Sequence, residues 1–175
     1  MRSGILLFVF SLPFCPSLPA QQPSGTTLTP QPMRRDVRYR ILFREIAAYQ
    51  GIAAQLAAQS KPNAFVLNYL TQALQLTSTQ ADQLNSIALP CAQQIQVIDR
   101  QAAAIIQAAR GKYGLSEGVA VPPVPAELVQ LEAQRTALIL AAVSTIADAF
   151  GPSQFATFDS MVQQHIGSGY KVSGH

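Results

Sequence analysis

The side chains that could carry out catalysis or hold a metal ion are few and widely spaced in this chain of 175 residues. Nucleophilic catalysis needs a base beside a Ser or Cys and a third group that orients the base, and a metal site needs several His, Cys or carboxylate ligands. The only histidines are His165 and His175, and no glycine-rich loop of the phosphate-binding type occurs. Apart from Asp36 and Glu45, which lie among the N-terminal arginines, the carboxylates are scattered, at Asp82, Asp99, Glu117, Glu127, Glu132, Asp148 and Asp159. We therefore expect no catalytic residue, no cofactor and no metal site, and a protein that is not an enzyme.

The dominant pattern is one long amphipathic helix over residues 76–110. Apolar side chains recur there at spacings of three and four, which places them on one stripe of a helix. These are Leu84, Ile87, Ala88, Cys91, Ile95, Ile98, Ala102, Ile105, Ile106 and Ala109. Such a helix would be roughly 50 Å long and needs a partner helix to cover its stripe. Pro90 lacks a backbone N–H, so we expect a kink between residues 86 and 90.

The remaining pattern is also helical. We expect helices over residues 36–59, 64–75, 125–150 and 152–167, with a loop at 111–124 that contains three glycines and two prolines. Phe65, Leu67, Leu70 and Leu74 are the expected apolar anchors of the short second helix. No strand pattern competes, so the predicted fold is all-α: a bent antiparallel helical hairpin with additional N- and C-terminal helices, within a helical domain at residues 34–167.

The N-terminus has the pattern of an export signal. Arg2 precedes a short apolar run, and Ala20 ends a usable cleavage site, so residues 1–20 are the expected signal peptide. Residues 21–33 are rich in Pro, Ser, Thr and Gln and predict a flexible leader, and residues 168–175 predict a disordered tail. The expected location is periplasmic or secreted, with no transmembrane segment after cleavage. A net charge of +3 is too small to indicate a nucleic-acid partner.

Removal of the signal peptide would also remove Cys15 and leave Cys91 as the only cysteine. No internal disulfide could then form. Because Cys91 falls on the apolar stripe, it fits a small buried hydrophobic side chain. An intermolecular disulfide across a dimer is the alternative.

One cluster of arginines and one single arginine each allow two interpretations. Arg34, Arg35, Arg38, Arg40 and Arg44 form the densest charge cluster, which fits either a solvated helix start or a surface that attracts acidic lipid head groups or a client protein. Arg135 lies in the middle of an apolar stripe. Its stem could pack while its head reaches water, or it could form a partly buried ion pair with Glu132 and Asp99.

A five-residue motif opens the long helix. Leu76, Thr77, Ser78, Thr79 and Gln80 place a hydroxyl at the helix start and a glutamine three residues later, which is the pattern of a capping box. A degenerate second copy occupies residues 150–154 and places Gln154 in the position of Gln80. With this motif the chain resembles the Spy-like family of exported bacterial proteins, whose signature is LTXXQ.

The resemblance implies a small helical envelope protein that acts as an ATP-independent chaperone or in the response to envelope stress, with a dimer as one assembly state. Unfolded client proteins are the partners expected from it. The alternative is a structural or interaction module of the cell envelope without chaperone activity, which would bind an envelope protein or a second copy of itself.

Overall fold

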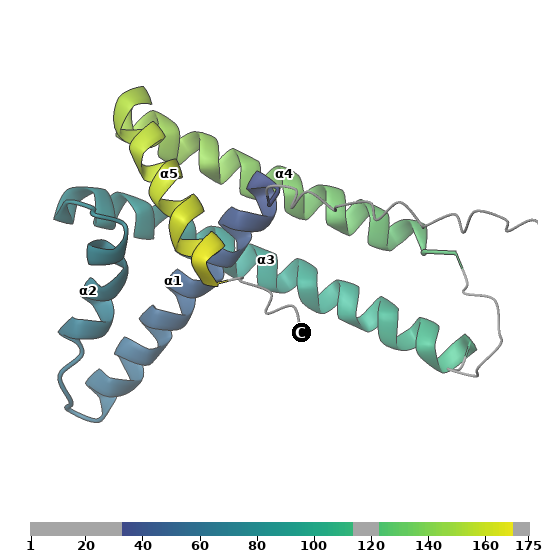
Figure 1. Ribbon diagram of the computed structural model, residues 1–175. Helices are drawn as coiled ribbons and strands as arrows, with labels where there is room; N and C mark the ends of the chain where they lie inside the picture. Colours follow the sequence, from purple (N-terminus) through teal and green to yellow (C-terminus); the bar gives the residue numbers. More distant parts are fainter. Residues whose placement is uncertain (1–32, 114–122, 170–175) are drawn as a thin grey trace, which may run out of the picture. The chain divides into compact units, whose positions relative to one another are not determined.

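Five α-helices make up the chain in the computed structural model, which describes residues 33–113 and 123–169. They are α1 (Arg35–Ala58), α2 (Ala64–Ala73), α3 (Ser78–Tyr113), α4 (Ala126–Phe150) and α5 (Pro152–Gly169) (Figure 1). No strand occurs in these two ranges, and the all-α prediction is confirmed. The expected signal peptide, almost all of the leader and residues 170–175 lie outside the described residues.

The predicted helix boundaries differ from the observed ones by at most three residues. The largest difference is at the end of α3, which continues to Tyr113. Helix α5 continues to Gly169 and so includes the first two residues of the expected tail. Helix α3 continues through Pro90 without interruption. The kink at Pro90 therefore stays a prediction. No helix in the described ranges is both long and apolar enough to cross a membrane.

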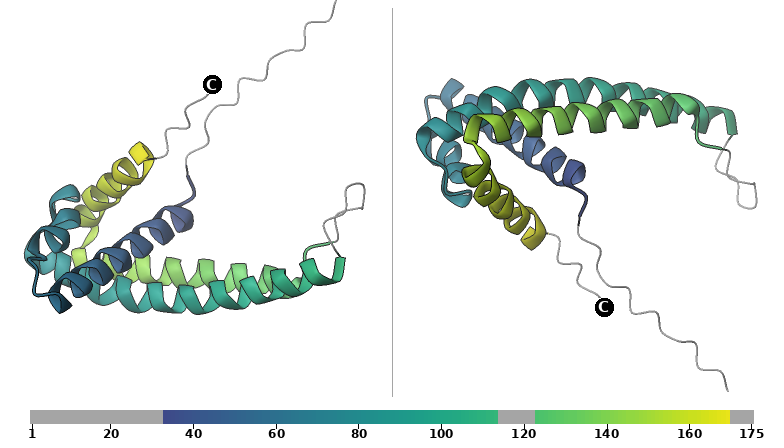
Figure 2. Two further views of the ribbon diagram at one scale, coloured as in Figure 1. Left: turned by 90° about the horizontal axis from the view of Figure 1, so that it is seen from below. Right: turned by 90° about the horizontal axis from the view of Figure 1, so that it is seen from above.

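One apolar core joins side chains from all five helices. Its largest fully buried members are Tyr39, Leu42, Phe43 and Ile46 of α1, Leu74 after α2, Ile95 of α3, Ile139 and Ile146 of α4, and Val162 of α5. Helices α1, α4 and α5 supply seven of these nine residues, and the predicted stripe of α3 supplies Ile95. Figures 1 and 2 show α1, α2 and α5 gathered at the end of the α3/α4 pair where α3 begins and α4 ends.

Helices α3 and α4 lie side by side and run in opposite directions (Figure 2). Their far part has no third helix over it, and we call residues 100–111 and 126–134 the arm. No side chain of the arm is buried, although its apolar stripe continues through Ile105 and Ile106. The stripe of α3 is therefore fully covered only where α1 also packs on it.

The expected anchors of α2 are partly wrong. Phe65 is 70% exposed and Leu67 is 40% exposed, whereas Val66, Leu70 and Leu74 are buried. The buried residues follow one another at intervals of four, so they share the helix face that points to α1. Phe65 and Leu67 flank Val66 in the sequence and lie to either side of that face.

Candidate functional site

The predicted capping box at the start of α3 is present. The backbone N–H of Gln80 donates to Oγ1 of Thr77 at 3.2 Å, and the backbone N–H of Thr77 donates to Oε1 of Gln80 at 3.0 Å. These reciprocal bonds satisfy backbone donors that a helix start leaves open. Leu76 packs against the core just before the cap. The motif residues therefore fix where α3 starts.

The two copies of the motif meet in space. The side-chain amide of Gln80 donates to Oε1 of Gln154 at 2.8 Å across 74 residues of sequence. Gly151, inside the second copy, has a φ of +75°, a left-handed conformation that glycine adopts without a Cβ clash. This turn lets α5 fold back beside the start of α3. Both copies then line one shallow pocket, with Leu76 and Gln80 on one side and Ser153 and Gln154 on the other.

Most of the N-terminal arginine cluster is engaged in ion pairs within the fold. Arg34 pairs with Asp36 at 2.9 Å, and Arg38 pairs with Asp159 of α5 at 3.1 Å. Arg35 approaches Asp159 at 3.7 Å and lies over the ring of Phe155, 5.1 Å from its centroid.

The expected client surface must be corrected at Arg38, which is only 8% exposed. Its head group is held under α5 because Asp159 accepts hydrogen bonds from both Arg38 and the Tyr39 hydroxyl, the latter at 2.8 Å. Burial of Tyr39 and this bond to Asp159 raise the pKa of the phenol above its ordinary value. The Asp159 cluster therefore joins α1 to α5.

Asp99 forms a second ion cluster, which decides the two interpretations of Arg135. Arg135 of α4 pairs with Asp99 of α3 at 2.6 Å and also with Glu132, while Arg40 of α1 reaches Asp99 at 3.3 Å. The Arg135 side chain is mostly buried, so the partly buried ion pair is the interpretation that the structure supports. Asp99 therefore lies where α1, α3 and α4 converge.

Arg44 is the one member of the cluster without such a partner in the described chain. Its side chain is exposed and lines a shallow groove between α1 and α3, together with Ile95, Gln96, Asp99, Arg100 and Ala103. The five predicted surface arginines therefore have different roles. Three of them, Arg35, Arg38 and Arg40, join α1 to other helices, whereas Arg34 pairs within the start of α1 and Arg44 faces solvent.

Cys91 is 4% exposed and makes no disulfide. Burial raises the pKa of its thiol from 9.0 to about 11, because the surrounding apolar side chains disfavour the thiolate. These observations support the buried hydrophobic interpretation. An intermolecular disulfide would require the sulfur to become accessible.

His165 is part of a small polar cluster with Glu45 and Tyr69. Its Nε2 lies 3.0 Å from a carboxylate oxygen of Glu45, and its ring lies 6.4 Å from that of Tyr69. The described residues contain no group of three His, Cys, Asp or Glu side chains that could hold a metal ion. His175 lies outside the described residues.

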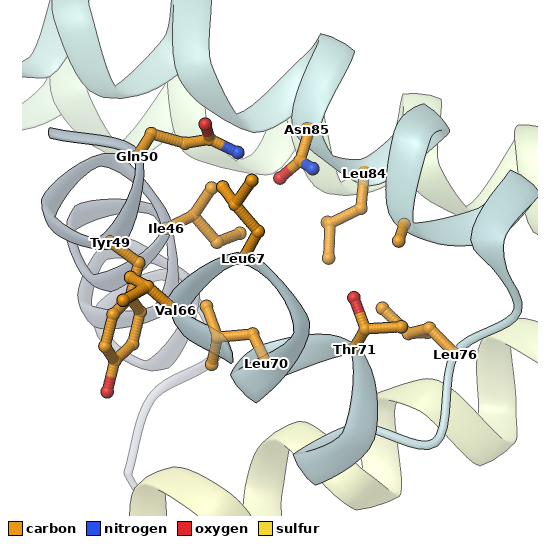
Figure 3. Close-up of a pocket in the computed structure, with 11 residues that line it drawn as sticks. Ile46, Tyr49, Gln50, Val66, Leu67, Leu70, Thr71, Leu76, Leu84 and Asn85 are labelled. Carbon is orange, nitrogen blue, oxygen red and sulfur yellow. The ribbon is translucent and has the colours of Figure 1, made fainter. Parts of the chain in front are cut away.

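A groove between α1, α2 and the start of α3 is the surface feature that sequence reasoning missed (Figure 3). Its apolar lining includes Ile46, Leu67 and Leu84, and the amides of Gln50 and Asn85 are at the top of the view in Figure 3. No charged residue lines it among those described. Every residue from 46 to 81 is uncharged except Lys61. This long uncharged stretch is the sequence pattern that could have indicated a surface without charged side chains.

Large apolar side chains are exposed on two of the helices that form this groove. Phe65 and Tyr69 lie one helical turn apart on α2, and Ile52 lies on α1. The ring of Tyr69 stands 5.2 Å from that of Tyr49. We call Ile52, Phe65, Leu67 and Tyr69, together with the groove, the neutral apolar surface. Comparison of the chain with protein-family models, curated proteins and solved structures finds no match.

Proposed function

We propose that this protein is an exported, ATP-independent chaperone of the cell envelope that binds unfolded polypeptide on its neutral apolar surface. The observation that carries the proposal is the exposure of Phe65, Leu67 and Tyr69 on α2, the helix that forms one wall of an uncharged groove. Exposed apolar patches on soluble proteins mark interaction sites more often than chance. The proposal also agrees with the resemblance of residues 76–80 to the Spy-like motif.

The chemistry of the groove suits a client without a defined sequence. Its apolar lining can take up an apolar side chain of an unfolded chain, which is favoured by about 25 cal/mol for each Å² removed from water. The amides of Gln50 and Asn85 and the hydroxyl of Thr71 can donate to and accept from the backbone of any polypeptide. Because no charge lines the groove among the described residues, clients of either sign can approach it.

The test is suppression of aggregation by the purified chain, using two unrelated unfolding proteins in the absence of nucleotide. Suppression of both near equal concentration supports the proposal. Binding of a single envelope protein, or only of a second copy of the chain, without suppression would contradict it and favour the interaction module.

Two matched variants locate the surface. Phe65→Gln with Leu67→Gln removes exposed apolar groups from α2, and the suppressing activity should fall at least fivefold. Val129→Gln with Leu140→Gln removes exposed apolar groups from α4 and should change it less than twofold. All four positions are exposed and helical, so both variants should stay folded. An equal loss in both variants would contradict the assigned surface.

Export is tested separately. The chain produced with its own N-terminus in a bacterial host should be recovered outside the cytoplasm, and its mass should be that of a chain beginning at Gln21. Recovery of the uncleaved chain in the cytoplasm would contradict this part of the proposal.

A further inference from the structure

The pairing of charges singles out two arginines on one side of the molecule. Arg34, Arg35, Arg38, Arg40 and Arg135 each have a carboxylate within 4.0 Å. Among the described side chains, Arg44, Arg100, Arg110 and Lys61 have none at that distance. Arg44 and Arg100 share a groove, the one between α1 and α3.

The acidic residue in this groove does not neutralise these two arginines. Asp99 also lines the groove, but its carboxylate is already held by Arg135 at 2.6 Å and by Arg40 at 3.3 Å. Arg100 donates instead to the backbone carbonyl of Gln96 at 3.3 Å. The groove therefore has two uncompensated positive charges on its rim, and it attracts anions.

The floor between the two arginines is apolar. Ile95 is fully buried beneath it, and the exposed methyl group of Ala103 lies at its edge. The groove is open and shallow, whereas sites for small ligands enclose most of the ligand surface. An extended or helical polypeptide segment fits such a surface better than a small molecule does.

We propose that the groove of Arg44 and Arg100 binds an acidic polypeptide segment in which Asp or Glu alternates with apolar residues. Each guanidinium can hold a carboxylate through two parallel N–H···O bonds, and the apolar side chains of the segment would cover the exposed methyl group of Ala103. This inference rests on the proposed function and deepens it, because it names a class of client and a second groove that would bind it.

The experiment is fluorescence anisotropy of a labelled peptide with alternating Glu and Leu, titrated with the purified full chain at two salt concentrations. Binding should weaken as salt rises, because exposed ion pairs are screened. The same peptide with Gln in place of Glu should bind at least tenfold more weakly. Equal binding of the two peptides would overturn the proposal.

Matched variants separate a specific groove from overall charge. Arg44→Gln with Arg100→Gln should weaken binding of the acidic peptide at least tenfold. Arg110→Gln with Lys61→Gln removes the same charge from exposed positions elsewhere and should weaken it less than twofold. Similar losses in the two variants, or no loss in the first, would overturn the proposal.

Two outcomes keep this inference distinct from the proposed function. If the protein binds the acidic peptide through Arg44 and Arg100 but suppresses no aggregation, the groove stands and the chaperone proposal fails. If it suppresses aggregation with no dependence on these arginines and no peptide binding, the groove proposal fails alone. Binding to vesicles of anionic phospholipid in place of the acidic peptide would also overturn it.

Discussion

The two ends of the α3/α4 pair carry the same kind of apolar stripe but differ in how much of it is covered. Near the start of α3, Leu84, Ala88, Cys91 and Ile95 are buried because α1 packs on the side of α3 that α4 leaves open. In the arm, Ile105 is half-buried and Ile106 is 38% exposed, since no third helix of the described ranges lies over this part of the α3/α4 pair (Figure 2).

The Asp99 cluster marks the boundary between these two regions. Arg40 brings in α1, Arg135 brings in α4, and both reach the carboxylate of α3. A helical stripe in the sequence therefore shows which side chains can be buried, but the number of neighbouring helices decides which of them are. Stability should be concentrated between Asp99 and the start of α3, where α1 also packs. We call this part the covered end, and its stability can be compared with that of the arm.

The largest expected difference comes from two isoleucines on the same helix. Ile95→Ala should lower the free energy of unfolding by about 3 kcal/mol, because Ile95 is fully buried and its removal leaves a cavity. Ile106→Ala, about three turns further along the helix, should cost less than about 1 kcal/mol because the side chain is already partly in water. Chemical denaturation monitored by circular dichroism measures both. Equal costs would contradict the division into a covered end and an arm.

The next largest effect on stability is expected at the Asp159 cluster, which lies at the covered end. Asp159→Asn keeps an oxygen that can accept the Tyr39 hydroxyl but leaves Arg38 buried without a counter-charge. We expect a loss of about 2 to 3 kcal/mol, less than for a fully buried pair because the Asp159 side chain is 28% exposed.

The double variant Arg38→Met with Asp159→Asn tests the reason for this loss. It should recover most of the stability, because the uncompensated charge is gone and Nε of Arg38 has no hydrogen-bond partner in the described chain to lose. If the double variant is as unstable as Asp159→Asn alone, the loss does not arise from the buried charge.

Alkaline pH should destabilise the covered end through Cys91. Above pH 9 the unfolded chain loses the thiol proton, whereas the folded chain keeps it until about pH 11, so the folded state binds more protons and stability falls across this window. The two pKa values set an upper limit of roughly 2.7 kcal/mol for the loss. Tyr39, whose pKa is also raised, adds to the decline at the upper end.

Cys91→Ala should make the dependence on pH shallower between pH 9 and 11, as measured by denaturation at a series of pH values. The arm supplies the comparison for thiol access. A cysteine at position 106, made as Ile106→Cys in the Cys91→Ala background, should react with a thiol reagent at nearly the rate of a free thiol. Cys91 itself should react only as fast as the protein opens, and fast labelling of the folded wild type would contradict its burial.

Local features of the fold were predictable from the sequence, whereas features that depend on distant partners were not. Thr77 and Gln80 are three residues apart, and their cap formed as predicted. By contrast, Arg38 and Asp159 are 121 positions apart, and Arg40 and Asp99 are 59 apart. The charge cluster was visible in the sequence, but no local pattern indicates which arginines find acids elsewhere.

The apolar face of α2 was only partly predicted from the sequence. Val66, Leu70 and Leu74 follow a helical period of four and could have been chosen over Phe65 and Leu67 on spacing alone. A large aromatic side chain suggested an anchor, yet Phe65 lies on the outer side of a helix that packs mainly on one neighbour. The neutral apolar surface follows from this short helix, because α2 offers only one face to the core.

The smallest expected effect tests whether the meeting of the two motif copies stabilises the covered end beyond the cap itself. Gln80→Ala removes the reciprocal bond to Thr77 as well as the bond to Gln154, and should cost about 1 kcal/mol. Gln154→Ala removes only the exposed bond between helices and should cost no more than about 0.5 kcal/mol. A double-mutant cycle measures the interaction energy between Gln80 and Gln154. A coupling energy near zero would mean that the packing of α5 brings the two glutamines together and that their contact does not help to hold α5 in place.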